Sequence, residues 1–324
     1  MNFQNMEYFL TVAETLNITR AARRLNISQQ ALSNSVSRLE EELGCQLFDR
    51  RQGLRLTFAG RQYRDAARRM LDIHKQTSAL LSDISGSLRG ELRIGIAHTR
   101  GQALLPLLLP EFIRKYPLVE LSVREESTRE LETDLERGDL DVLIGFAPFM
   151  FEGAEYYPLM REQFYLVIPK TLLEGREDAA ALLEKFRAGR NIRLFKDFPF
   201  VFLKEGDRIR TIADRVFAKA GFEPIIKFET SNTQTAVALA AEGVGITICP
   251  ELYLNSKYIA SGMADSYIRQ RVEICPLFAG DEAGYIAIGY NKNRYLSQIA
   301  SDFIQMSLRR FGRSDAIRPE RREP

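Results

Sequence analysis

The sequence has no apolar run long enough to cross a membrane. Hydrophobic residues make up 45% of its 324 residues, but no stretch reaches the roughly 18 consecutive apolar residues that indicate a transmembrane helix. Residues 1–16 mix Asn, Gln and Glu with apolar residues and lack the order of regions typical of a secretory signal peptide. We therefore expect a cytoplasmic protein.

Cysteine is also scarce. Cys45, Cys249 and Cys275 lie far apart, and neither a CxxC pair nor a Cys/His spacing typical of zinc occurs. This pattern favours reduced, mostly buried thiols, and we expect no metal. A redox pair formed by Cys249 and Cys275 remains open as an alternative.

The sequence lacks the motifs of the common enzyme classes. It has no nucleophile elbow, Walker loop, dinucleotide-binding glycine fingerprint or His–carboxylate pair. We therefore expect neither an enzyme nor a cofactor. The chain is long enough for two or three domains.

Basic residues are unevenly distributed, although the formal net charge is only +2. Residues 1–90 contain 13 Lys and Arg against 9 Asp and Glu, and seven arginines lie within residues 50–69, where Asp65 is the only acid. Such a basic segment is typical of a contact with a polyanion. A solvated charged face is the alternative.

Three short helices are predicted within the first forty-four residues. Met6, Phe9, Leu10 and Ala13 share one face of the first helix, and we expect Thr19 to cap a second helix over Arg20–Leu25. Ser28 then caps a third helix that ends at Gly44. The outer face of this third helix carries amides and hydroxyls in place of Lys and Glu: Gln29, Gln30, Ser33, Asn34, Ser37 and Arg38.

This arrangement is typical of a helix-turn-helix. Amide side chains form paired hydrogen bonds with adenine, and hydroxyl groups contact bases or phosphates. A merely polar surface helix is the alternative. Residues 46–50 and 54–57 predict two short strands of a wing, with Gly53 in the turn. Arg50, Arg51 and Arg55 would then hold phosphates beside the third helix.

A long helix is predicted over Ala59–Ser85, with Thr57 as its cap. Its apolar and small residues recur with spacings of four and three, a heptad period that indicates a coiled coil. A helix packed on its own domain is the alternative. These residues, the heptad seam, are Ala59, Tyr63, Ala66, Met70, Ile73, Thr77, Leu80 and Ile84. We expect Tyr63, Met70, Ile73, Leu80 and Ile84 to form a dimer contact, and Gly86, Ser87 and Gly90 to form a hinge.

From Glu91 onwards, strands alternate with helices, which predicts an α/β fold with a largely parallel sheet in each of two lobes. The expected strands cover 91–96, 119–124, 140–144, 164–168, 200–203, 225–229, 244–248, 271–274 and 285–288. The expected helices cover 101–115, 129–137, 172–186, 208–220, 233–241 and 295–311.

Polar residues follow three of these strands, where open α/β sheets place their ligands. His98, Thr99 and Arg100 follow the first strand, and Thr230, Ser231 and Asn232 follow the strand over 225–229. The third such segment is 204–207. Hydroxyls, backbone N–H groups and Arg100 would suit an anion such as a carboxylate. Ordinary helix capping is the alternative. His98 is expected to line the site and not to bind a metal.

The sequence resembles the LysR-type transcriptional regulators over essentially its whole length. The most specific segment runs from Asn17 to Gly60, NITRAARRLNISQQALSNSVSRLEEELGCQLFDR followed by RQGLRLTFAG. Further similar segments are GELRIG from Gly90, LPEFIRKYP from Leu109, LERGDLDVLIG from Leu135 and AEGVGITICPE from Ala241. Gln30 and Phe58 stand where the family usually has proline, and Asn34 where it often has arginine.

The resemblance implies a winged helix-turn-helix, a long linker helix and a two-lobed sensor related to periplasmic solute-binding proteins. It implies that Phe146 and Phe202 lie near the effector cleft with Thr99, Thr230 and Ser231. It implies that double-stranded promoter DNA, a small effector and further copies of the chain, as a dimer or tetramer, are the partners. A constitutive architectural DNA-binding protein is the alternative function.

The expected domains follow from these assignments. The DNA-binding domain covers residues 1–58 and the linker helix covers 59–89. The effector domain covers 90–312, with one lobe over about 90–163 and 267–312 and the other over about 164–266. Residues 313–324 form a flexible tail.

Overall fold

The computed structural model describes residues 2–51, 53–86, 89–254, 264–278 and 284–311. By its internal contacts the chain divides into two units, Met1–Gly86 and Ser87–Pro324. None of the helices within the described ranges is both long and apolar enough to span a membrane. The predicted tail over 313–324 lies outside the described residues.

The first unit begins with the three expected helices, α1 (Phe3–Thr15), α2 (Ile18–Arg24) and α3 (Gln29–Leu43). Ser28 caps α3 at its start and Gly44 ends it in the left-handed conformation, as predicted. The expected cap of α2 was wrong, because Asn17, not Thr19, accepts the hydrogen bond from the Arg20 N–H. The three helices enclose Phe9, Leu32 and Leu39, none of which has measurable exposure.

The wing is a short antiparallel pair, β1 (Phe48–Asp49) and β2 (Arg55–Leu56). It is joined to α3 by Glu40, which is only 6% exposed. The Glu40 carboxylate accepts hydrogen bonds from the backbone N–H groups of Leu47 and Phe48 at 2.7 and 3.0 Å. A buried carboxylate with two N–H donors holds the base of the wing at a defined position on α3.

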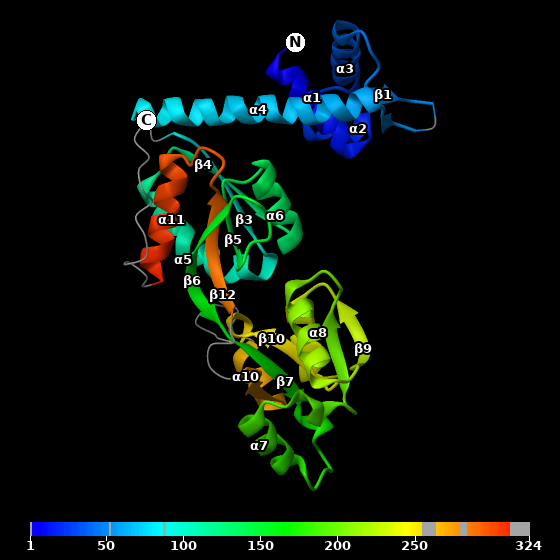
Figure 1. Cartoon of the computed structure of the whole chain (residues 1–324), viewed down its shortest axis with the longest axis vertical. Helices are drawn as coiled ribbons and strands as arrows, with labels where there is room; N and C mark the ends of the chain where they lie inside the picture. Colours follow the sequence, from blue (N-terminus) through cyan, green and yellow to red (C-terminus); the bar gives the residue numbers. More distant parts are fainter. Residues whose placement is uncertain (1, 52, 87–88, 255–263, 279–283, 312–324) are drawn as a thin grey trace. The chain divides into compact units, whose positions relative to one another are not determined.

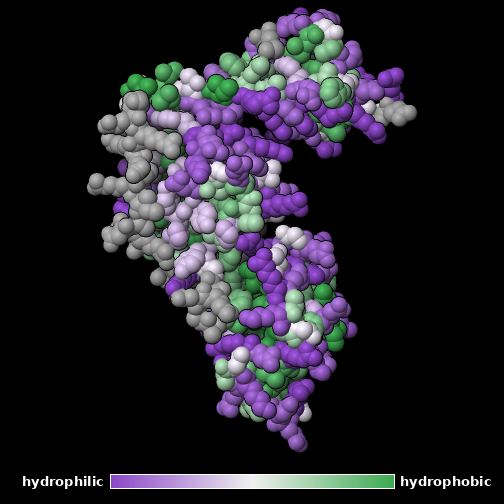
Figure 2. Space-filling model, viewed as in Figure 1, coloured by the Kyte–Doolittle hydropathy of each residue, from purple (hydrophilic) through white to green (hydrophobic). Residues whose placement is uncertain are grey.

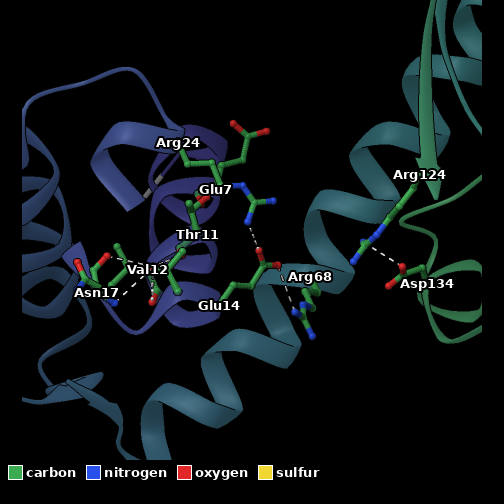
Figure 3. A network of polar contacts seen from close by, with 10 residues as sticks. Glu7, Thr11, Val12, Glu14, Asn17, Arg24, Arg68, Arg124 and Asp134 are labelled. Atoms are coloured by element: carbon green, nitrogen blue, oxygen red, sulfur yellow. Dashed lines mark hydrogen bonds and ion pairs between the residues drawn. The ribbon is translucent and has the colours of Figure 1, made fainter. Parts of the chain in front are cut away.

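Helix α4 (Phe58–Ile84) has the predicted cap, Thr57, which accepts a hydrogen bond from the Gly60 N–H. Its N-terminal half packs within the first unit, where Ala67 and Leu71 are buried against Met6 of α1. An ion-pair network also joins the helices, because Glu14 of α1 lies between Arg24 of α2 and Arg68 of α4 at 3.0 and 3.5 Å (Figure 3).

The second unit contains two lobes, of which lobe I is built around one sheet and lobe II around two smaller ones (Figure 1). Lobe I has a five-stranded sheet in the order β4-β3-β5-β12-β6, in which β12 is antiparallel to both of its neighbours. The strands are β3 (Gly90–Ile96), β4 (Val119–Glu125), β5 (Val142–Phe146), β6 (Ala154–Glu162) and β12 (Gly284–Asn291). Strand β6 was not predicted.

Helices cover both faces of the lobe I sheet. On one face α5 (His98–Lys115) and α11 (Gln298–Arg310) meet through the rings of Phe112 and Phe303, whose centroids lie 5.2 Å apart. On the other face α6 (Thr128–Arg137) buries Leu131 and Leu135 against residues of β5 and β12. Because successive side chains of a strand face opposite sides of its sheet, the fully buried β5 supplies both cores.

Lobe II differs from the predicted parallel sheet. Strands β10 (Thr247–Pro250), β7 (Phe164–Pro169) and β11 (Val272–Pro276) form an antiparallel sheet, whereas β8 (Pro199–Leu203) and β9 (Ile225–Thr230) pair in parallel. Its helices are α7 (Ala179–Gly189), α8 (Arg208–Ala220), α9 (Thr233–Ala241) and the unpredicted α10 (Ala264–Arg271).

The chain passes between the lobes twice, after β6 and again after β11 (Figure 1). Because β11 pairs with β7, lobe II extends to Pro276, and the expected return to lobe I at residue 267 was too early. Alternation of strands and helices locates the elements of a sheet, but it does not show which neighbour each strand pairs with.

The two sensor cysteines cannot form a disulfide in this arrangement. Cys249 of β10 lies opposite Tyr165 of β7, and Cys275 of β11 lies opposite Leu166, on the other edge of the same strand. Successive residues of β7 face opposite sides of the sheet, so the two thiols do too. Two strand spacings, about 10 Å, also separate them. The Cys249–Cys275 redox alternative is therefore wrong, and burial raises the pKa of both thiols.

Candidate nucleic-acid interface and ligand cleft

The outer face of α3 leaves polar side chains accessible above a buried inner face. Gln29, Gln30, Asn34 and Arg38 are exposed, and Ser33 and Ser37 are half-buried. The inner residues Leu32, Val36 and Leu39 are at most 1% exposed. The fold therefore fixes the axis of α3 and leaves its amides and hydroxyls available for hydrogen bonds to another molecule.

Thr19, which the sequence predicted as a helix cap, instead contacts the polar face of α3. Thr19 of α2 donates a hydrogen bond from its hydroxyl to the Gln29 side-chain oxygen at 3.1 Å. That contact orients the Gln29 amide across the turn between the two helices. The sequence contains no signal for it, because it depends on how α2 and α3 pack.

The three arginines of the wing are held in different ways. Arg50 lies 3.4 Å from buried Glu40, which ties it to the base of the wing. Arg51 pairs with Asp49 at 3.3 Å, but its side chain is 90% exposed. Hydrogen bonds from the backbone and side chain of Arg51 lower the pKa of the Asp49 carboxyl. Arg55 is exposed. Exposed ion pairs are weak, so Arg51 and Arg55 remain available to phosphates.

The C-terminal half of α4 presents apolar side chains to solvent. Figure 2 shows hydrophobic residues gathered toward this end of α4. The exposed members of the heptad seam are Met70 (42%), Ile73 (64%), Leu80 (40%) and Ile84 (73%). Tyr63, also predicted as a dimer contact, is instead half-buried, with its ring 4.9 Å from that of Phe9. It serves the core of its own domain because the first turns of α4 pack on α1.

The predicted ligand residues at the start of α5 have different environments. His98 and Thr99 are the first residues of α5, and their side chains lie outside the described residues. Arg100 is 4% exposed and pairs with buried Glu162 at 3.0 Å. The N-cap residue Ala97 provides no side-chain hydrogen bond to α5. Of the three predicted ligand segments, the segment at the start of α5 therefore lacks a side-chain cap for its helix.

The other two segments cap their own helices. Asn232 accepts hydrogen bonds from the first turn of α9, and Asp207 does the same for α8. The Thr230 hydroxyl accepts a hydrogen bond from the Asn232 N–H, while Ser231 is exposed. Capping accounts for most of the polar residues here, which was the alternative left open by the sequence.

The two predicted aromatic residues are both buried but have different neighbours. Phe146 lies between two arginines, with the guanidinium carbons of Arg100 and Arg208 5.9 and 5.4 Å from its ring centre. Phe202 is 2% exposed and packs on Phe217 in the core of lobe II. The β8 backbone turns this side chain toward α8, and the contact of Phe202 with an effector stays a prediction.

A cavity of about 370 Å³ lies between the lobes, beside Phe146 and the start of α8. Small-molecule sites commonly have volumes of this size. Lobe I supplies α6 and residues 150–151, and lobe II supplies the start of α8. The lining residues are Thr128, Arg129, Glu132, Thr133, Glu136, Met150, Phe151, Gly206, Arg208 and Thr211. Gly206 belongs to the predicted segment 204–207. The other lining residues were not predicted, because they come from distant segments with no shared motif.

A further polar contact joins the lobes near this cavity. The Gln234 amide of α9 donates a hydrogen bond to the Gln102 side-chain oxygen of α5 at 2.9 Å. Within the described ranges, no group of three or more His, Cys, Asp or Glu is arranged to hold a metal ion.

Family models match both units of the chain. The model described as "Bacterial regulatory helix-turn-helix protein, lysR family" matches residues 3–61, and the model described as "LysR substrate binding domain" matches residues 85–312. The chain is 31% identical over 319 residues to YcgK, an HTH-type transcriptional regulator of Bacillus subtilis (strain 168), covering 95% of this chain and 94% of YcgK.

Two further proteins extend the comparison. ClcR, an HTH-type transcriptional regulator of Pseudomonas putida, is 32% identical over 257 residues, which cover 78% of this chain and 83% of ClcR. The solved structure of full-length CbnR with its target DNA has 22% identity and a TM-score of 0.61, covering 96% of this chain and 100% of CbnR. The chain and CbnR therefore share a fold.

Proposed function

The chain belongs to the LysR family of DNA-binding transcriptional regulators, and we propose that it reads promoter DNA sequence-specifically as a dimer or tetramer and responds to a small, carboxylate-bearing anion held between its lobes. Family membership makes it a regulator with an effector domain and not an enzyme. Three points are proposals: the oligomeric state of the chain, the residues that contact DNA, and the chemical class of the effector.

The exposed polar face of α3 is the observation that carries the proposal. Gln29, Gln30 and Asn34 present amides that can pair with adenine, and Arg38 presents a guanidinium group. Two of the wing arginines, Arg51 and Arg55, would contact phosphates and so set the position of α3 without reading bases.

Self-association is supported by apolar surface that this chain leaves uncovered. The exposed part of the heptad seam would pair with the same residues of a second copy, which is how a helical seam buries its apolar face. A dimer then presents two α3 helices to two half-sites. The exposed residues Ile225, Ile226 and Phe228 of β9, 39–50% accessible, support a second self-contact of the kind a tetramer needs.

The proposed effector site is the cavity and the adjoining α5 N-terminus. Unpaired backbone N–H groups at a helix start attract anions, and α5 begins without a side-chain cap. Both lobes line the cavity, so an occupant interacts with both and shifts the population toward the lobe arrangement that it fits.

The DNA roles are tested by anisotropy titration with a promoter fragment from upstream of the chain's own gene and with a scrambled duplex. Gln29→Ala should weaken binding to the promoter by about 1–3 kcal/mol and leave the scrambled duplex unaffected. Arg51→Ala should weaken both equally. With on the order of eight phosphate contacts, the log–log salt dependence should have a slope near −7.

Gln62→Ala removes an exposed amide from α4, outside the proposed contact face, and serves as the matched control. The proposed roles are wrong if Gln29→Ala and Arg51→Ala have the same effect on both duplexes. Equal affinity of the unmodified protein for promoter and scrambled DNA would contradict sequence-specific binding itself.

A further inference from the structure

Two half-buried side chains of opposite charge face the interlobe cavity without forming an ion pair. Glu132 comes from α6 of lobe I and Arg208 from the start of α8 in lobe II. Both have intermediate exposure, whereas Arg129, Glu136 and Met150 of the same lining are exposed. The cavity therefore has an inner pair of opposite charges and a more accessible rim.

Arg208 has an aromatic ring in place of a counter-ion. Its guanidinium carbon lies 5.4 Å from the centre of the Phe146 ring. Across the described parts of the chain, its side chain forms no hydrogen bond or ion pair. Burial lowers the pKa of this guanidinium, and Glu132 opposes that effect. A partly desolvated cation of this kind gains more from an added anion than a fully hydrated one does.

Within the described part of the chain, the Glu132 side chain forms a single hydrogen bond. Its carboxylate accepts from the Met150 backbone N–H at 3.2 Å. Burial raises the pKa of the Glu132 carboxyl, while the Met150 N–H and the charge of Arg208 oppose the shift. The carboxylate thus has acceptor capacity left for a cationic donor.

The lining as a whole carries no net charge, since its two arginines are balanced by its two glutamates. An anion that satisfies Arg208 would place a second negative charge near Glu132. An amine that satisfies Glu132 would bring a positive charge toward Arg208. A molecule with both a carboxylate and an ammonium group satisfies both side chains and keeps the cavity neutral.

We propose that this cavity binds a zwitterionic molecule of the α-amino-acid class, with its carboxylate on Arg208 and its ammonium group on Glu132. Met150 and Phe151 supply apolar surface for a hydrophobic side chain. Because Glu132 and Arg208 belong to different lobes, the bound zwitterion bridges the lobes. The inference rests on the proposed sensor function and keeps the carboxylate of its effector. It differs in net charge, because the added ammonium group makes the effector a neutral zwitterion and not an anion.

The test is calorimetric titration of the full-length protein with L-leucine, L-methionine and L-phenylalanine. Each is compared with its deaminated acid and its decarboxylated amine; for L-phenylalanine these are 3-phenylpropanoate and 2-phenylethylamine. We expect at least one amino acid to bind, and its acid and amine to bind about tenfold or more weakly, since each lacks one charge-assisted contact.

Two variants assign the contacts. Arg208→Gln and Glu132→Gln should each weaken binding of that amino acid about tenfold to a hundredfold. Lys219→Gln removes an exposed cation from the same helix outside the cavity and should leave binding unchanged. Thermal unfolding of each variant without ligand checks that it is folded. The comparison of each amino acid with its acid and its amine uses the unmodified protein, so it tests the inference even if a variant does not fold.

The inference is overturned if none of the three amino acids binds, if an acid binds as tightly as its amino acid, or if Lys219→Gln has the same effect as Arg208→Gln. An acid that binds without an ammonium group and alters promoter affinity would overturn this inference while leaving the sensor function standing. Failure of promoter recognition in the anisotropy titration would contradict the proposed function independently of these ligands.

Discussion

Replacing Glu162 by glutamine should destabilise the effector unit strongly, because it leaves a buried cation without its counter-charge. The side chains of Arg100 and Glu162 are 5% and 1% exposed, and their closest N and O atoms lie 3.0 Å apart. At an effective dielectric constant of about 20, that separation corresponds to roughly 5–6 kcal/mol of attraction.

The pair also has a large desolvation cost. Among the residues that the structure describes, Arg100 Nε and Glu162 Oε1 are buried without a hydrogen-bond partner. Burial raises the pKa of the Glu162 carboxyl despite the opposing charge of Arg100. We therefore expect Glu162→Gln to lower the free energy of unfolding by about 3–5 kcal/mol, the usual cost of removing one partner of a buried pair. The double variant Arg100→Met with Glu162→Leu should regain most of this loss.

Urea unfolding of the full chain measures these changes. The sequence has 12 tyrosines and no tryptophan, so tyrosine fluorescence and circular dichroism report the transitions. Amide hydrogen exchange in β6 and α5 assigns the loss to this site. Asp178→Asn is the matched control, because it breaks a pair of the same 3.0 Å separation whose side chains are 44% and 60% exposed. If Glu162→Gln costs no more than this control, the buried-charge reasoning is wrong.

Three further perturbations follow from the structure. Ile73→Glu places a charge in the exposed part of the heptad seam, and it should shift the protein toward monomers in sedimentation experiments. Glu40→Ala removes the acceptor of two backbone N–H groups at the base of the wing and should destabilise the first unit by about 2–3 kcal/mol in thermal unfolding. Burial would raise the pKa of Asp302, but hydrogen bonds from Tyr116, Gln298 and Lys115 together lower it. Because the folded pKa lies below the unfolded one, this stabilisation is present at neutral pH and is lost as the pH falls through the folded value. Asp302→Asn should therefore cost about 1 kcal/mol near pH 7 and progressively less below pH 4.

Each of the three has a contradicting result. An Ile73→Glu protein that stays dimeric would show that the heptad seam is not the self-contact. A Glu40→Ala protein with unchanged melting of the first unit would show that water replaces the carboxylate at no cost. A pH-independent difference between Asp302→Asn and the unmodified protein would show that the Asp302 pKa is not lowered.

The N-terminal unit could be predicted closely because its signals are local. Ser28, Gly44 and Thr57 set the ends of α3 and α4, and each acts through backbone groups within a few residues of itself. The 3.6-residue pattern of α3 likewise separates its buried and exposed faces. Tyr63, predicted as a dimer contact, packs on Phe9, because a heptad pattern does not distinguish a helix that packs on its own domain from one that packs on a second copy.

The sensor showed the limits of local patterns more clearly. The spans of α8 and α9 agree with those predicted from periodicity, whereas the pairing of β7 with β10 and β11 was missed. Strand order depends on hydrogen bonds between segments far apart in the chain, and no local spacing encodes them. The same holds for Phe202, whose burial depends on α8 lying over β8.

Capping residues, apolar periodicity and the family motifs in the chain were thus sufficient to identify a helix-turn-helix regulator with a two-lobed α/β sensor. Only the folded arrangement put Glu132 and Arg208 into one cavity and put Cys249 and Cys275 on opposite faces of a sheet. The physical reason is the range of the interactions. Caps and helical faces act over one or two turns of chain, whereas a ligand site or a disulfide depends on distances between residues that only tertiary packing brings together.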